Sequence, residues 1–155
     1  MLSVKGLLSL LFALLALPLS VRAAGPGALG NTEDALSFAL SFALEAAGPY
    51  VKKGFTIRED FWGGDLPANT PKPIVHQLFK GNEYWFWMGS DEKDAKISVH
   101  VYDSAGHIAE SEAWQKPHFA GVRVTPKNTG SYYIIVEVEK SPAARTRWAL
   151  AYGYR

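Results

Sequence analysis

The densest group of chemically useful side chains is the aromatic run Tyr84-Trp85-Phe86-Trp87-Met88. Successive side chains of a β-strand point to opposite faces of its sheet. We therefore expect Tyr84, Phe86 and Met88 to face the core, and Trp85 and Trp87 to face outward. Two outward indoles would form a stacking platform for sugar rings or a protein contact. The alternative is that an N-terminal helix lies across this face and covers both indoles, because large apolar patches on monomers are uncommon.

Trp62 is the third candidate ligand-binding residue. It belongs to the motif Phe61-Trp62-Gly63-Gly64, in which a bulky pair precedes two glycines. Glycine inside a strand is typical of a bend or bulge, or of a close approach between backbones. The motif would either shape a ligand pocket or plug one mouth of a sandwich as a strand end.

Calcium is the one cofactor that the sequence raises. Asp91, Glu92 and Asp94, with Asp103 nearby, would supply the oxygen ligands that this ion prefers. Lys93 interrupts the charge, and the spacing matches no standard calcium loop. We therefore expect a solvated turn and no resident cofactor.

The histidines are His76, His100, His107 and His118. A hairpin would bring His100 close to His107, but a zinc site needs three or four ligands and no third is evident. We therefore predict no metal site.

Sequence motifs for catalysis are also missing. The chain has no Gly-x-Ser-x-Gly nucleophile signature, phosphate loop or dinucleotide fingerprint. The carboxylates Glu59, Asp60 and Asp65 fit polar strand and turn positions better than an acid–base pair. We therefore predict a binding or accessory protein rather than an enzyme. The alternative is a secreted hydrolase or metal-dependent enzyme whose site no motif marks.

The elements that position these side chains are predicted to be mainly β-strands. Short alternating segments separated by Gly, Pro, Asn and Asp predict an antiparallel, jelly-roll-like β-sandwich of about eight strands in residues 49–155. Ile97, Val99 and Val101 mark one inward face. The predicted strands cover residues 55–62, 74–79, 84–88, 96–102, 108–114, 120–125, 132–139 and 147–152.

An amphipathic helix is predicted over residues 31–48, after a flexible N-terminus at 24–30. Asn31 or Thr32 would cap it, and Gly48-Pro49 would end it. Leu36, Leu40 and Leu44 would lie on its packed face with Ala43 and Ala47, flanked by Phe38 and Phe42.

Residues 1–23 have the layout of a secretory signal peptide. Lys5 precedes an apolar run of about 12 residues, and Val21-Arg22-Ala23 fits a peptidase site. The run is shorter than the roughly 20 residues that span a bilayer. We therefore expect cleavage after Ala23 and export to the periplasm or the extracellular space.

Composition narrows the partners. The 155 residues carry a formal net charge of +1 and no cysteine. Near neutrality argues against nucleic acid as a partner, and an exported chain without disulfides must rely on its core. We expect a protein that is not integral to the membrane after cleavage. A small outer-membrane barrel is a weaker alternative, because most predicted strands are shorter than the 9–11 residues such barrels use.

Three further motifs lie in residues 78–154. Gly81 shortly precedes the strand of Tyr84; a later strand ends in Tyr102-Asp103-Ser104-Ala105-Gly106; and Thr129-Gly130-Ser131-Tyr132 enters another strand. Gly130 would take a backbone angle that other residues avoid, Asp103 and Gly106 would form a tight turn, and Tyr132 would form a tyrosine corner.

In this order the motifs resemble the bacterial pre-peptidase C-terminal domain. That resemblance implies a jelly-roll sandwich of the kind appended to secreted peptidases, some relatives of which bind matrix proteins or polysaccharide. Here a predicted helix and two predicted strands precede the module. The resemblance therefore implies an accessory or binding role, with polysaccharide or an envelope protein as the partner.

Overall fold

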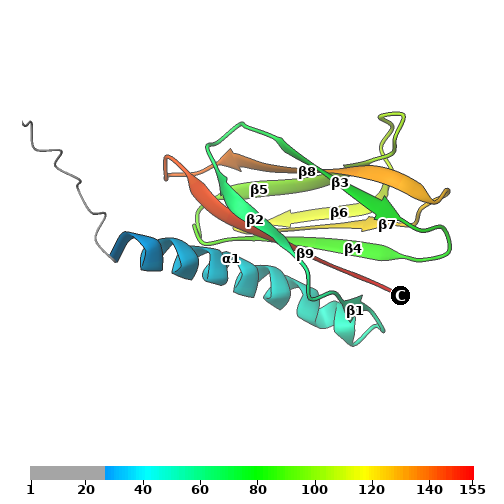
Figure 1. Ribbon diagram of the computed structural model, residues 1–155, viewed down its shortest axis with the longest axis horizontal. Coiled ribbons are helices and arrows are strands. Elements are labelled where there is room, and N and C mark those ends of the chain that lie inside the picture. Colours follow the sequence, from blue (N-terminus) through cyan, green and yellow to red (C-terminus); the bar gives the residue numbers. More distant parts are fainter. Residues whose placement is uncertain (1–26) are drawn as a thin grey trace, which may run out of the picture.

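The computed structural model describes residues 27–155, with side chains from Glu33 onward. The predicted signal peptide at 1–23 and residues 24–26 lie outside the described residues. The described chain is mainly β, with one helix followed by nine strands (Figure 1). The elements are α1 (Gly27–Val51), β1 (Thr56–Ile57), β2 (Trp62–Leu66), β3 (Lys72–Leu78), β4 (Tyr84–Ser90), β5 (Lys96–Tyr102), β6 (Glu110–Lys116), β7 (Phe119–Val124), β8 (Gly130–Lys140) and β9 (Thr146–Tyr154).

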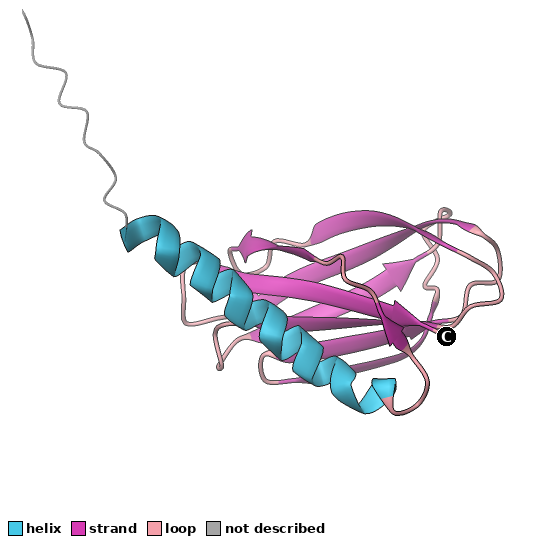
Figure 2. Cartoon of the chain, turned by 60° about the horizontal axis from the view of Figure 1, so that its bottom comes forward, coloured by secondary structure: helices cyan, strands magenta, loops and turns pink. Residues whose placement is uncertain are grey.

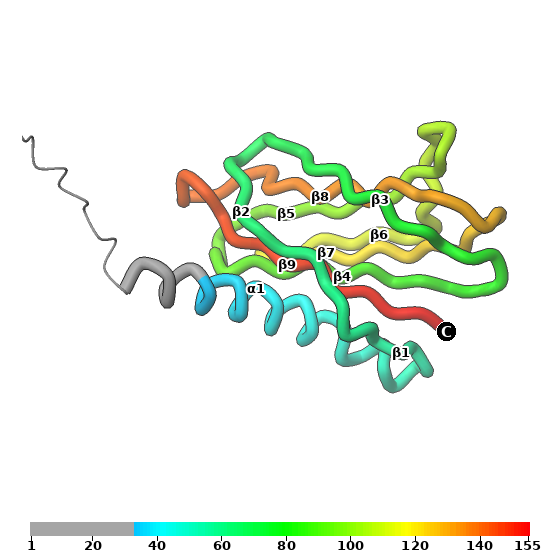
Figure 3. The backbone as a smooth tube through the Cα atoms, in the orientation of Figure 1, coloured from blue at the N-terminus to red at the C-terminus, as the bar shows by residue number. Residues whose placement is uncertain are grey.

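The strands form two antiparallel sheets that face each other as an open sandwich, which confirms the predicted fold class. The larger sheet has the order β1-β9-β4-β7-β6, and β2 also pairs with β9. The smaller sheet has the order β3-β8-β5. The predicted strand 55–62 is two strands, β1 and β2, which pair with successive parts of β9 near the C-terminus (Figure 3). Arg58, Glu59 and Asp60 between them are exposed, although the backbone N–H of Arg58 still donates to the carbonyl of Tyr152 in β9 at 2.9 Å.

The predicted alternation sets the core between the sheets. Ile97, Val99 and Val101 of β5 are buried, as are Ile134 and Val136 of the neighbouring β8. Across the sandwich, β4 contributes Tyr84, Phe86 and Met88 to the same cluster, as predicted. This arrangement leaves Trp85 and Trp87 on the outer face of the larger sheet.

Helix α1 is longer than predicted at both ends. It begins at Gly27, so Asn31 and Thr32 lie inside it instead of capping it. Pro49 also lies inside, within the last turn, where its missing N–H costs only one helical hydrogen bond. The chain turns after Val51 at Gly54, whose φ of 90° favours glycine. No helix within residues 27–155 has the length and apolar character needed to cross a membrane.

The helix lies across the outer face of the larger sheet (Figure 2). Its buried stripe is Ala39, Ala43 and Ala47, at the spacing of one helical face. The prediction is confirmed for Ala43 and Ala47 and wrong for Leu44, which is exposed, while Leu36 and Leu40 are partly buried. The reason is close contact: a Cβ on Gly89 of β4 would meet the backbone of Ala43 at 2.4 Å. Only small side chains fit between the helix and a strand at that distance.

Candidate functional site

Trp85 and Trp87 lie under α1 and are 3% and 0% exposed. Their indoles stack on each other with centroids 6.5 Å apart, and the ring of Tyr50 covers both at 4.4 Å and 5.3 Å. The covering helix, stated above as the alternative, is therefore the arrangement found. The candidate stacking platform at Trp85 and Trp87 is not exposed, because the helix needs an apolar surface and this stripe supplies it.

Trp62 is half-buried at the start of β2, which pairs with β9 of the larger sheet. Its ring contacts His76 and Tyr152 at centroid distances of 5.0 Å and 5.3 Å, and the hydroxyl of Tyr152 donates to Asp60 at 3.0 Å. A Cβ on Gly63 would meet the side chain of Leu36 at 2.5 Å, and the nearest backbone atom is the carbonyl oxygen of Trp148 at 3.2 Å, so the closest neighbour is a side chain of α1. Trp62 therefore packs on these two rings and is partly exposed, away from Trp85 and Trp87.

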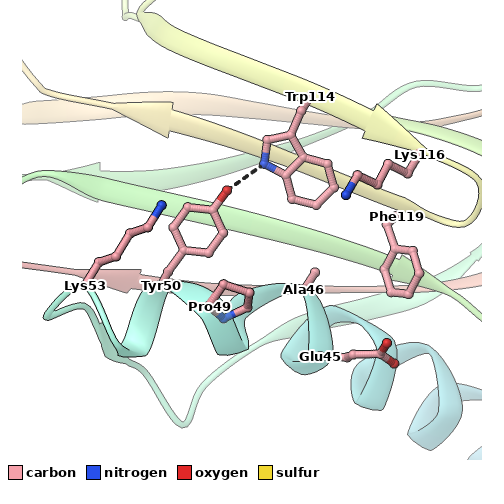
Figure 4. A pocket seen from close by; sticks show the side chains of 8 residues that line it. All are labelled: Glu45, Ala46, Pro49, Tyr50, Lys53, Trp114, Lys116 and Phe119. Carbon is pink, nitrogen blue, oxygen red and sulfur yellow. Dashed lines mark hydrogen bonds between the residues drawn. The ribbon is translucent and has the colours of Figure 1, made fainter.

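A groove with partly exposed aromatic side chains opens instead between α1 and the β6–β7 hairpin (Figure 4). Its volume is about 360 Å³, within the range of small-ligand sites. Tyr50 closes it on the helix side, and Trp114 and Phe119 line it on the sheet side. The remaining lining residues are Glu45, Ala46, Pro49, Lys53 and Lys116.

Trp114 is held rigidly in this groove. It sits opposite Gly121 in the β6–β7 ladder, and a Cβ on Gly121 would lie 2.4 Å from the indole. The missing side chain lets the ring lie against the backbone of β7. On the helix side, the indole Nε1 donates to the hydroxyl of Tyr50 at 2.9 Å. Burial raises the pKa of that hydroxyl, although the hydrogen bond from Trp114 opposes the shift, so Tyr50 stays neutral at physiological pH.

Two lysines and one carboxylate supply the charge of the groove. The Nζ of Lys53 lies 5.0 Å from the centroid of Tyr50, and that of Lys116 lies 5.7 Å from the centroid of Trp114. Glu45 projects from α1 on the side of Phe119 (Figure 4). The site thus combines flat apolar rings with a net positive charge, a combination that suits ring-shaped ligands bearing polar groups.

The predicted turn at Asp103 is confirmed. Its carboxylate accepts from the backbone N–H groups of Ala105 and His107, both at 2.9 Å, and Gly106 has a φ of 82°. These hydrogen bonds hold the pKa of Asp103 below its ordinary value. Asp103 therefore stabilises its own turn.

The tyrosine corner is confirmed as well. Tyr132 is buried, and its hydroxyl donates to the carbonyl of Asn128 at 2.8 Å. The prediction for Gly130 is wrong, because it has no positive φ and simply starts β8 opposite Leu78. Tyr84 has a role beyond packing: its hydroxyl accepts from the backbone of Phe79 and the side chain of Asn82, each at 3.1 Å.

The acidic residues considered for calcium do not converge. Asp91 lies in the turn before β5 and Asp103 after it, at opposite ends of that strand. The carboxylate of Asp91 accepts from the backbone N–H of Arg147 at 3.1 Å. Within residues 27–155, no three His, Cys, Asp or Glu side chains gather as a metal site would require.

His100 and His107 bind different carboxylates instead of sharing a ligand. His100 Nδ1 lies 2.7 Å from Glu110, whose other oxygen accepts from the N–H of Val101 at 2.7 Å. His107 lies 3.6 Å from Asp103. Glu110 thereby covers the free edge of β5 with a β6 side chain, which protects an edge strand from unwanted pairing.

A second opening of about 680 Å³ lies at the end of the sandwich that holds Asp103 and Tyr132. It is formed by the turn before β6 and the loop before β8. Its polar lining combines short hydroxyl and amide side chains with the charged Asp103, Glu110 and Lys127 and with His107. It offers no aromatic platform comparable to the groove.

Sequence reasoning missed Tyr50, Trp114 and Phe119. A signal for Trp114 existed, since the predicted strand 108–114 places it on the same face as the charged Glu112, and β6 continues this face to Lys116. Packing in the core between the sheets does not account for a tryptophan on such an outward, charged face. Tyr50 carried no such signal, because the helix was expected to end before it.

The fold and groove define a two-sheet antiparallel sandwich protein with an aromatic groove between its helix and the β6–β7 hairpin. Neither the protein-family models nor the curated proteins include a match to this sequence. The resemblance to the pre-peptidase C-terminal domain therefore stays a prediction from its motifs.

Proposed function

We propose that this protein is an exported, non-catalytic binding module that holds an envelope saccharide in the groove between α1 and the β6–β7 hairpin. The supporting observation is the indole of Trp114, held against Gly121 and hydrogen-bonded to Tyr50 at 2.9 Å. The apolar face of a sugar ring stacks on such a surface, and a preorganised ring loses little entropy on binding. The signal-peptide layout of residues 1–23 supports export.

Binding is favoured over hydrolysis by the charge of the lining. Most glycosidases use two carboxyl groups, set on either side of the scissile bond. The groove lining contributes one, Glu45, together with two lysines. A protein ligand is the competing partner, but the groove at about 360 Å³ suits a few sugar rings better than a protein surface.

The test is calorimetric titration of the mature chain with cellohexaose, chitohexaose and hexagalacturonate. For any sugar that binds, Trp114→Ala should weaken binding by about tenfold or more, because the stacking surface is lost. Trp114→Phe retains a smaller ring and should recover part of the affinity. Phe38→Ala is the control, since this phenyl ring is 61% exposed on α1 outside the groove.

The proposal fails if none of the three sugars binds the folded protein. It also fails if Trp114→Ala, shown by circular dichroism to be folded, binds as tightly as the unmodified chain.

A further inference from the structure

Lys53 and Lys116 are the two cationic side chains of the groove, and each lies over one of its rings. They come from different elements: Lys53 from the turn after α1, and Lys116 from the last residue of β6. Neither forms an ion pair with a carboxylate of residues 27–155. Two ammonium groups thus approach one aromatic cleft from its two sides (Figure 4).

The neighbouring charged residues do not neutralise the positive charge of these two lysines. Arg123 is paired with Glu83 at 3.3 Å and with Glu112 at 3.4 Å, and Glu83 is also paired with Arg155 at 2.9 Å, so these two cations and two carboxylates largely compensate one another. Glu45 is the one acidic group in the lining and lies toward Phe119. The groove therefore carries two positive charges against one negative charge.

Resting on the proposed function, we infer that the saccharide is acidic: a polyuronate whose rings stack on Trp114 and Tyr50 while its carboxylates pair with Lys53 and Lys116. The attraction of an ammonium for a ring face at an exposed site is weak, comparable to an exposed ion pair. A carboxylate can therefore draw each lysine off its ring and free that ring for stacking. A free anion has no apolar face and gains only the charge contact.

The experiment compares hexagalacturonate with its fully methyl-esterified form, which keeps the rings and removes the charge. At about 20 mM salt we expect the acid to bind roughly five- to tenfold more tightly than the ester. At about 500 mM salt this advantage should largely disappear, because exposed charges are screened. Because the chain has five tryptophans, stacking on Trp114 is reported by the change in emission that is lost in Trp114→Phe.

Lys53→Gln and Lys116→Gln should each reduce the preference for the acid while leaving affinity for the ester nearly unchanged. Glu45→Gln should increase the preference. Lys140→Gln is the charge-matched control, since Lys140 is exposed at the end of β8 and is not part of the groove lining.

The possible failures are distinct. If acid and ester bind equally and both depend on Trp114, the inference of an acidic ligand is overturned and the saccharide-binding proposal stands. If the acid is preferred but Lys140→Gln weakens its binding as much as Lys53→Gln and Lys116→Gln do, the preference comes from general charge attraction. That result would overturn the inference. If neither form nor any neutral sugar binds, both proposals fall.

Discussion

At the scale of single residues, Tyr132 shows how one hydroxyl fastens a loop. Its ring is buried in the core, and its hydroxyl donates to the carbonyl of Asn128 at 2.8 Å. Tyr132→Phe keeps the ring and removes the bond, so we expect the free energy of unfolding in urea to fall by about 1 kcal/mol.

Tyr133→Phe is the matched control for this prediction. Tyr133 is the next residue along β8 and its side chain is exposed on the other face of the sheet. We expect no change in its free energy of unfolding. Equal losses in the two variants would contradict the role given to the Tyr132 hydroxyl.

At the scale of elements, the position of α1 depends on Gly89. A Cβ there would lie 2.4 Å from the backbone nitrogen of Ala43 and 2.5 Å from the carbonyl oxygen of Ala39, and neither backbone atom can move without moving the helix. Gly89→Ala should therefore displace α1, lower the free energy of unfolding by about 1–3 kcal/mol, and open Trp85 and Trp87 to acrylamide. Fluorescence quenching measures that exposure.

Gly48→Ala is the comparison variant. Gly48 lies within α1, and apart from its chain neighbours a Cβ there meets nothing within 4 Å. Alanine has the higher helix propensity, but the ring of the following Pro49 disfavours the helical conformation of a residue that carries a Cβ. We therefore expect the free energy of unfolding to change by less than about 1 kcal/mol and quenching to stay unchanged. If Gly89→Ala leaves the two tryptophans shielded, the close helix–strand contact does not determine where α1 lies.

At the scale of the whole molecule, His76 links the two sheets. It projects from β3 of the smaller sheet and contacts Trp62 and Tyr152 of the larger one, with centroids at 5.0 Å and 4.9 Å. Burial lowers the pKa of His76, and the negative charge of nearby Asp60 offsets part of the shift. The folded state therefore holds this proton less tightly than the unfolded state does.

Stability should decrease with falling pH as a result. The contribution of His76 is complete above the unfolded pKa of about 6.5 and is lost as pH falls from that value through the lower folded-state pKa, because in this range the unfolded chain binds the extra proton. His76→Gln should reduce the difference in free energy of unfolding between about pH 7.5 and about pH 5. His107→Gln, whose side chain is 80% exposed, serves as the control. An unchanged pH dependence in His76→Gln would contradict the assignment.

Local patterns in the sequence were sufficient to predict most of the β-strands and much of the core between the sheets. Ile97, Val99 and Val101 point inward because side chains alternate along a strand. The sequence shows this directly, since apolar residues occupy every second position. The turn at Asp103 and the corner at Tyr132 were predictable for a similar reason: their hydrogen bonds join residues at most four positions apart. The predicted role of Gly130 failed because no backbone constraint at that position requires glycine.

The tertiary structure decided which aromatic groups are exposed. Trp85 and Trp87 are outward in their strand, as alternation predicts, and yet buried, because α1 packs on that face through contacts between residues some 40 positions apart. The groove has the same origin: Tyr50 meets Trp114 across 64 residues. Alternation along a strand determines the face of its sheet on which a side chain lies. Whether that face is open to solvent depends on which distant element packs against it.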